Sequence, residues 1–350
     1  MGRVTTTTGP ATGRVPFWDN ARFVAVTLVV VGHGVQRLTY SDSALVAYLF
    51  IYAFHVPAFS FISGYFSKSG PLTARDLKKL LTDLVLPYLI MEAIWSVVQW
   101  LVEGRQEFNP TTASWTLWFL LALAIFRLVL PYLALVRFPL LWAVVLSVSV
   151  GYFDNVDSTF SLSRAIGLLP FFVLGWKVRQ WGVLDRLLTT VRGLWWLRAA
   201  GAAVLAAWLA VVVLLIGTFR DMHLQAWFFY DDSYRVIGAD QWWAGGVRLG
   251  FMALGVLLTA AFLALVPRRE TWVSDLGRAT MYIYLLHSFV LYPIRETGIL
   301  KGHDDAGVWL AAMVLAGVAI SLALASPLVR RVFRPLVDPK PRWLFAPTSP

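Results

Sequence analysis

The chain lacks cysteine entirely and has few charged residues. With no cysteine in 350 residues, a thiol nucleophile, a thiolate metal site and a disulfide are excluded. Charged residues make up only 14% of the chain, whereas 58% is hydrophobic. The net charge of +10 does not indicate nucleic-acid binding, because no basic block is interleaved with a soluble fold. This composition, with a mean hydropathy of +0.66, indicates a polytopic membrane protein.

Apolar runs long enough to cross a bilayer recur along the whole chain. A helix needs about 20 apolar residues to span a hydrocarbon core about 30 Å thick. The runs predict ten transmembrane helices, near residues 17–37, 44–66, 80–102, 113–131, 138–152, 164–181, 199–218, 246–266, 276–294 and 306–329. We therefore expect an all-α polytopic membrane helix bundle over residues 17–334, with flexible ends at 1–16 and 335–350.

The basic residues predict the orientation of this bundle. About 22 of the 30 lysines and arginines lie in the N-terminus, the even-to-odd loops and the C-terminal tail. The positive-inside rule places these segments in the cytoplasm, so both termini are expected there and residues 219–245 form an extracytoplasmic loop. The first sixteen residues lack a short apolar run before a small-residue cleavage site, so we expect the first membrane helix to be retained.

Four ionisable residues lie deep within the predicted helices: His33, His55, Glu92 and His287. Each is about eleven residues from a predicted helix end, which at about 1.5 Å per residue is near the middle of the bilayer. Ionisable residues at that depth usually face a cavity or the bundle interior. The shared depth predicts one polar catalytic site between the first, second, third and ninth helices. Interhelical hydrogen bonding remains the alternative for each of them.

A second set of residues is cationic and lies at the predicted cytoplasmic boundary. Its members are Arg22, Lys78, Lys79, Arg127 and Arg278. Guanidinium groups bind phosphate oxygens in a bidentate fork. The set therefore predicts a phosphate-bearing donor that enters from the cytosol and reaches the histidine in the membrane. The alternative is that these residues are ordinary positive-inside anchors.

Several segments carry a resemblance to a known family. The run WDNARFVAVTLVVVGHG over residues 18–34 resembles the first-helix signature of the acyltransferase family 3 integral-membrane O-acyltransferases, a basic residue followed after ten others by a histidine. Further matching segments follow in order: FHVPAFSFISGYFSK (54–68), LPYLI (86–90), WTLWFLLAL (115–123), LLPFFVLG (168–175) and LGRATMYIYLLHSFV (276–290). The resemblance is greatest to the fucose 4-O-acetylase-like branch and spans about residues 17–330.

The resemblance implies transfer of an acyl group, usually acetyl, from cytosolic acetyl-CoA to a hydroxyl of a glycan or glycolipid. His33 matches the family's essential histidine, and Arg22 matches its basic partner. Family members often carry two basic residues three apart before the third helix, whereas here Lys79 is followed by Thr82 and Asp83. Lys78 or Arg75 is the expected replacement. We expect a multi-pass protein of the plasma membrane, and partner glycan-export machinery is compatible with this activity.

The residue chemistry suits acyl transfer to a hydroxyl. A neutral imidazole at His33 can accept the proton of a sugar hydroxyl as that hydroxyl attacks a thioester, which typically accelerates a reaction about 10²- to 10⁴-fold. Glu92 or His55 is expected to orient the imidazole. Ser63 is a candidate acyl carrier, and Tyr65, Trp118 or a backbone amide is a candidate oxyanion donor. No histidine or glutamate pair has metal-ligand spacing, so no metal is expected.

Two other activities fit the same residues. A proton-coupled transporter or flippase also places histidine and glutamate in the middle of the membrane. Alternatively, the protein moves the acyl group across the membrane and a partner completes the transfer. The aromatic residues of 219–245 suit either stacking on the sugar of an acceptor or an interfacial aromatic belt.

Overall fold

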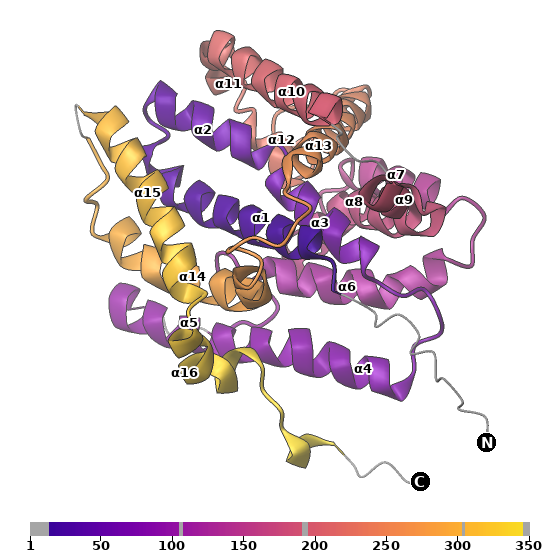
Figure 1. The fold of residues 1–350 in the computed structure, drawn as a ribbon. Coiled ribbons are helices and arrows are strands. Elements are labelled where there is room, and N and C mark those ends of the chain that lie inside the picture. The colour runs from indigo at the N-terminus through magenta and orange to yellow at the C-terminus, as the bar shows by residue number, and fades with distance from the viewer. Residues whose placement is uncertain (1–13, 105–107, 191–194, 303–304, 346–350) are drawn as a thin grey trace, which may run out of the picture.

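The computed structural model describes residues 14–104, 108–190, 195–302 and 305–345, and these residues form helices and no strands (Figure 1). The α-helices are α1 (Pro16–Val35), α2 (Asp42–Tyr52), α3 (His55–Tyr65), α4 (Ala74–Leu80), α5 (Leu86–Glu103), α6 (Trp118–Leu133), α7 (Pro139–Val150), α8 (Leu162–Trp181), α9 (Val183–Thr190), α10 (Trp195–Leu214), α11 (Ile216–Asp221), α12 (Gln225–Phe229), α13 (Ala244–Leu265), α14 (Thr280–Glu296), α15 (Ala306–Leu324) and α16 (Pro327–Val337). A π-helical turn, η2 (Leu81–Val85), joins α4 to α5. Short 3₁₀ turns are η1 (Gln36–Leu38), η3 (Thr159–Ser161), η4 (Leu276–Ala279) and η5 (Arg342–Leu344).

Large apolar side chains on the outside of the bundle identify it as a membrane protein. Leu101, Leu214 and Leu315 are 72%, 80% and 71% exposed, and each lies on a long apolar helix. Exposure on this scale is unfavourable in water and favourable in lipid, where helices satisfy their own backbone hydrogen bonds. The described residues contain seven helical segments long and apolar enough to cross a membrane, together with the shorter apolar helices α6 and α7. The all-α polytopic bundle is confirmed, while the number ten and the location of the termini stay predictions.

Helix α1 lies in the middle of the bundle. It contacts α14 and α15 as well as α2 and α3, and these helices surround it in Figure 1. Small residues allow the close packing, since a Cβ on Gly317 of α15 would lie 2.8 Å from the Val31 side chain. Small residues at helix contacts are the usual means by which helices approach closely in lipid. The central position of α1 places its polar residues among several neighbouring helices.

A buried amide fixes the start of α1 to the loop that follows α13. The Asn20 side chain donates hydrogen bonds to the carbonyl oxygens of Pro267 (2.9 Å) and Arg269 (3.0 Å). Its oxygen accepts hydrogen bonds from the hydroxyls of Thr271 (2.9 Å) and Ser274 (2.7 Å). Asn20 is fully buried, so these bonds satisfy the whole amide.

Several helix boundaries differ from those predicted from hydropathy. The predicted span 44–66 is broken between α2 and α3, where Phe54 leaves helical geometry (φ −142°, ψ −16°). Pro57 explains the break, because its ring would clash with the carbonyl group of Ala53 in a continuous helix. The predicted span 113–131 begins only at Trp118, after a turn in which Trp115 has a φ of +38°.

The predicted loop and tail are also partly helical. The last predicted span ends at Leu324 rather than 329, and the amphipathic helix α16 follows it and continues to Val337. Residues 335–337 of the predicted flexible tail 335–350 thus belong to α16, and η5 adds a further turn. The predicted loop 219–245 contains α12. Residues 1–13 and 346–350 of the predicted flexible ends lie outside the described residues.

Candidate active site

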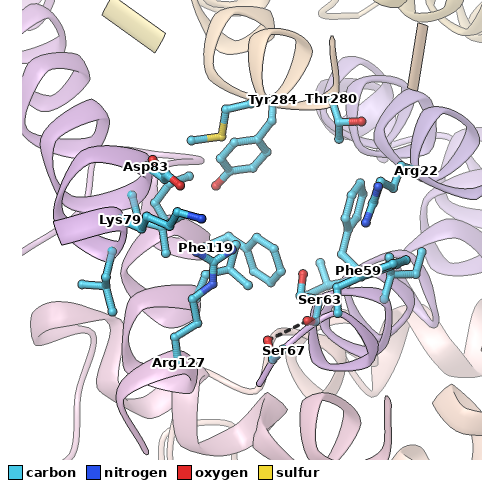
Figure 2. Close-up of a pocket in the computed structure, with 18 of the residues that line it drawn as sticks. Arg22, Phe59, Ser63, Ser67, Lys79, Asp83, Phe119, Arg127, Thr280 and Tyr284 are labelled. Carbon is cyan, nitrogen blue, oxygen red and sulfur yellow. Dashed lines mark hydrogen bonds between the residues drawn. The ribbon is translucent and has the colours of Figure 1, made fainter. Parts of the chain in front are cut away.

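A cavity of about 760 Å³ lies between α1, α3, α4, η2, α6 and the start of α14 (Figure 2). Its polar lining includes the predicted site residues Arg22, Lys79, Arg127, His33 and His55. Apolar residues such as Phe59, Ile62 and Phe119 line the space between these groups. The cavity has the size typical of a small-molecule site, about 300–1,000 Å³.

The cationic residues surround one part of this cavity. Figure 2 shows Arg22 on the opposite side of the cavity from Lys79 and Arg127, with the side chains directed toward the space between them. The Arg22 guanidinium lies 3.6 Å from the Asp19 carboxylate and 4.3 Å from the centre of the Phe66 ring. These contacts orient the Arg22 side chain while leaving it at the cavity wall. The arrangement can bind an anionic group between opposing cations.

Other basic residues besides Lys79 line the cavity near the start of the third predicted helix. Thr82, three residues after Lys79, does not line the cavity, whereas the acidic Asp83 lines it beside Lys79 (Figure 2). Lys68 also lines the cavity, and Arg127 reaches it from α6. Lys68 is not among the donor-binding residues predicted from the sequence.

Two predicted donor-binding residues are not among the residues that line the cavity. The Lys78 ammonium lies over the Phe345 ring, 4.4 Å from its centre. Arg278 pairs with Asp275 at 3.3 Å, and its side chain is half exposed. Helical geometry explains the separation of Lys78 from Lys79, because adjacent residues on a helix point about 100° apart.

His33 lies at the inner part of the cavity, in contact with two aromatic residues. Its Nδ1 atom is 3.3 Å from the hydroxyl oxygen of Tyr52, and its ring is 5.5 Å from the ring of Trp115. Gly32 makes the first contact possible, because a Cβ at this position would lie 3.0 Å from the Tyr52 ring. His33 is partly exposed within the cavity rather than fully buried.

The other two predicted histidines lie close to His33. The His287 ring centre is 5.5 Å from that of His33, and the His55 ring lies 4.6 Å from the Tyr52 ring. Backbone carbonyls are the partners of Nδ1 in both residues: Ile51 for His55 at 2.9 Å and Tyr284 for His287 at 2.7 Å. These bonds assign the hydrogen to Nδ1 of both rings. His55 lines the cavity, whereas His287 lies behind His33 with its Nε2 atom buried and without a hydrogen-bond partner in the described part of the chain.

Glu92 contacts a loop rather than His33. Its carboxylate accepts hydrogen bonds from the backbone N–H of Ser114 (2.9 Å) and from the Ser114 hydroxyl (2.6 Å). These hydrogen bonds hold the turn that carries Trp115 against His33, and α6 begins only after this turn, at Trp118. The sequence-based expectation that Glu92 orients the imidazole directly is wrong, because depth in the membrane does not indicate which helix faces meet.

The remaining sequence candidates divide between the cavity and its surroundings. Ser63 and Trp118 line the cavity, whereas the Tyr65 hydroxyl donates a hydrogen bond to Asp185 outside it. Sequence reasoning missed Thr116, which lines the cavity and whose buried hydroxyl oxygen has no partner among the described residues. It also missed Tyr52 and Trp115. Gly32, directly before His33, is the signal in the sequence that could have indicated a ring packed closely against this part of α1.

The segment 219–245 contributes mostly packing aromatics. Phe228, Tyr230 and Tyr234 are buried, and Tyr234 donates a hydrogen bond from its hydroxyl to the carbonyl oxygen of Val148 (2.9 Å). Trp242 and Trp243 are exposed instead, at 87% and 50%. Most of the buried aromatic residues therefore anchor the segment to α7 and α13, and the exposed pair is typical of a membrane interface.

Together these features define a polytopic membrane protein with a cavity that joins a cationic region to a histidine inside the bundle. Residues 15–326 match the family model described as an acyltransferase domain, and the chain belongs to acyltransferase family 3.

A curated relative adds a more distant similarity. The chain is 26% identical over 179 residues to nodulation protein NolL of Mesorhizobium japonicum, a match that covers 47% of each chain. The aligned segment thus spans about half the length of that relative. The comparison with solved structures found no match.

Proposed function

We propose that this protein is a plasma-membrane O-acyltransferase that transfers an acetyl group from cytosolic acetyl-CoA to a hydroxyl of a glycan or glycolipid, with His33 as the general base. The observation that carries the proposal is a single cavity lined by both His33 and the cations Arg22, Lys79 and Arg127. A donor with phosphates at one end and a reactive thioester at the other would place its phosphates against the cations and its thioester near His33.

The residues fit such a donor. Opposing cations bind phosphate oxygens by charge-assisted hydrogen bonds, and the apolar wall of Phe59, Ile62 and Phe119 excludes water from the space beyond them. When bound, acetyl-CoA supplies an activated acyl carbonyl. The protein's own task is to hold that carbonyl near His33 and to remove the proton of the attacking hydroxyl.

Tyr52 can set the tautomer of the base. If Nδ1–H of His33 donates to the Tyr52 hydroxyl oxygen, the Nε2 atom has a free lone pair and can accept a proton. The Thr116 hydroxyl, which has no partner among the residues that the structure describes, is our candidate donor for the negative charge that develops on the carbonyl oxygen.

The first test measures release of CoA from acetyl-CoA by purified protein, with a pool of cell-envelope glycans as acceptor. We expect His33→Gln to reduce release at least about 100-fold, the usual contribution of a general base. The matched control is His223→Gln, which changes an exposed histidine outside the cavity and should leave release unchanged. Thermal stabilisation of His33→Gln by acetyl-CoA should persist, which separates loss of chemistry from loss of the fold. Wild-type release by His33→Gln would contradict the proposal.

A second arm tests donor binding. Arg127→Gln removes a cation from the cavity wall and should raise the KM for acetyl-CoA about tenfold, equivalent to about 1.4 kcal/mol. Arg278→Gln is the matched control, because Arg278 is paired with Asp275 outside the cavity. An equal KM for acetyl-CoA in the two variants would show that Arg127 does not bind the donor.

A further inference from the structure

A second cavity, of about 300 Å³, lies at the other end of α1 from Arg22. Its lining residues are Gln36, Arg37, Thr39, Leu45, Tyr48, Gln225, Phe229 and Arg295. Gln36 and Arg37 follow directly on the last residue of α1, whereas Arg22 lies in its second turn. The 20-residue helix is about 30 Å long, so the two cavities open toward opposite ends of an element that could span a membrane.

Aromatic contacts connect this second cavity to His33. Tyr48, in the cavity wall, stacks on Tyr52 with a distance of 3.9 Å between ring centres, and Phe229 lies 5.8 Å from the same ring. The Tyr52 hydroxyl is in turn 3.3 Å from Nδ1 of His33. The ring of Tyr52 therefore stands between the second cavity and the imidazole.

A second connection from this cavity to His33 runs through Arg295 and Trp115. The Arg295 guanidinium, also in the cavity wall, lies 4.7 Å from the centre of the Trp115 ring, and Trp115 contacts the His33 ring at 5.5 Å. The Trp115 side chain therefore lies between Arg295 and the His33 ring, just as the Tyr52 side chain lies between Tyr48 and the His33 ring.

The lining suits a hydroxyl-rich ligand. Two amides, one phenol and two guanidinium groups provide donors and acceptors around the cavity, and aromatic faces are present at Tyr48 and Phe229. One carboxylate serves both arginines: Glu296 lies 3.6 Å from Arg37 and 3.2 Å from Arg295. Two arginines and one glutamate leave a net positive charge at the cavity, which favours a sugar with an acidic substituent over a cationic one.

A different cavity of about 310 Å³ lacks this chemistry. It lies beside α8, α9 and α13, and its lining is apolar apart from Thr259 and Arg268. It offers few groups that could bind the hydroxyls of a sugar. The two cavities of similar size differ in composition, and the polar one is the one that adjoins His33.

We propose that the polar cavity binds the hydroxyl-bearing sugar unit of the acceptor, so that donor and acceptor reach His33 from opposite ends of α1. This inference rests on the proposed acyl transfer. The acceptor oxygen forms a bond to the acyl carbon while His33 takes the hydroxyl proton. The bond from that carbon to sulfur breaks, and the CoA thiolate leaves through the donor cavity and takes up the proton. The Tyr48 and Tyr52 rings must move aside for the hydroxyl to pass, which keeps water in the second cavity from the thioester until a sugar is bound.

Reconstitution in proteoliposomes tests the two-sided arrangement. Water-soluble oligosaccharides released from the cell envelope are either enclosed in the vesicles or added outside, and acetyl-CoA is added outside only. We expect acetylated oligosaccharide only when the acceptor is enclosed. Acetylation only of acceptor added on the donor side would overturn the inference. The same mixture in detergent is the control: no transfer there would reject the proposed function itself rather than the site.

A substitution locates the site. Gln225→Trp fills the second cavity and should raise the KM for acceptor at least tenfold in detergent, without changing the KM for acetyl-CoA. Gln241→Trp is the matched control, because Gln241 is exposed in the same segment and does not line the cavity. Gln225→Leu, which removes the amide with little change in volume, should raise the KM in the same direction if Gln225→Trp fails to fold. An acceptor KM equal to that of the control in both Gln225 variants would contradict the assignment.

Discussion

Tyr52 makes contacts with both His33 and His55, yet it does not line the proposed donor cavity. It is 6% exposed and stacks on Tyr48. A buried phenol usually needs a hydrogen-bond partner, and here the partner is the proposed catalytic imidazole. In the proposed mechanism Tyr52 is therefore a positioning residue that acts through His33.

The variant Tyr52→Phe tests this role. It retains the ring and its stacking but removes the hydroxyl, and one hydrogen bond contributes about 1 kcal/mol. We expect kcat to fall about three- to tenfold while the KM for acetyl-CoA stays constant. Steady-state CoA release provides both constants, with Tyr132→Phe as control because Tyr132 is 69% exposed on α6. A rise in the KM for acetyl-CoA with constant kcat would assign Tyr52 to donor binding instead.

Some site residues could be predicted individually and others only as parts of a fold. His33 and Arg22 stand out in the sequence because ionisable residues are rare in an apolar helix. Tyr52 does not stand out, since tyrosine is common in membrane helices. Its importance arises from the position of its ring against Gly32, on a different helix.

At the scale of elements, the pair α3 and α8 depends on two glycines. A Cβ on Gly64 would lie 1.8 Å from the carbonyl oxygen of Phe172, and a Cβ on Gly175 would lie 1.9 Å from that of Phe61. Both distances are far below van der Waals contact, so the backbones touch directly. This contact positions the face of α3 that carries Phe59 and Ser63 at the proposed donor cavity.

We expect Gly175→Ala to force the two helices apart and to lower the free energy of unfolding by at least about 1–3 kcal/mol, the usual effect of overpacking. Thermal unfolding in detergent measures the loss. Gly250→Ala is a matched control, because Gly250 also lies in a helix, α13, and an added Cβ there has open space. A melting temperature for Gly175→Ala equal to that of the control would show that the helices can separate without loss.

Hydropathy predicted where most helices lie but not where they break. Centres of the predicted runs coincide with α1, α5, α8 and α13, because the bilayer requires continuous apolar length. The break between α2 and α3 and the late start of α6 depend on Pro57 and on the Glu92–Ser114 bonds. Neither feature lowers the apolar content of its segment by much, so hydropathy averaged over a window of residues does not detect it.

At the scale of the whole molecule, the absence of cysteine offers a direct test of orientation. Single cysteines can be introduced at Arg75, Lys340 and Asp240, which are all exposed. In right-side-out vesicles, a membrane-impermeant maleimide should label Asp240→Cys and should label Arg75→Cys and Lys340→Cys only after the vesicles are opened. The inverse pattern would reverse the predicted orientation. It would also exchange the membrane faces of the donor and acceptor cavities.

The sequence by itself determined that the chain is an all-α membrane protein, because lipid allows few other solutions for long apolar segments. It also determined the family resemblance and the two residues, Arg22 and His33, that lie on one helix at a fixed spacing. Only the tertiary structure decided which residues of other helices join them: Lys79 and Arg127 line the same cavity as Arg22 and His33, whereas Glu92 does not. Spacing along one helix follows from backbone geometry, whereas the rotation of each helix against its neighbours depends on side-chain packing across the whole bundle.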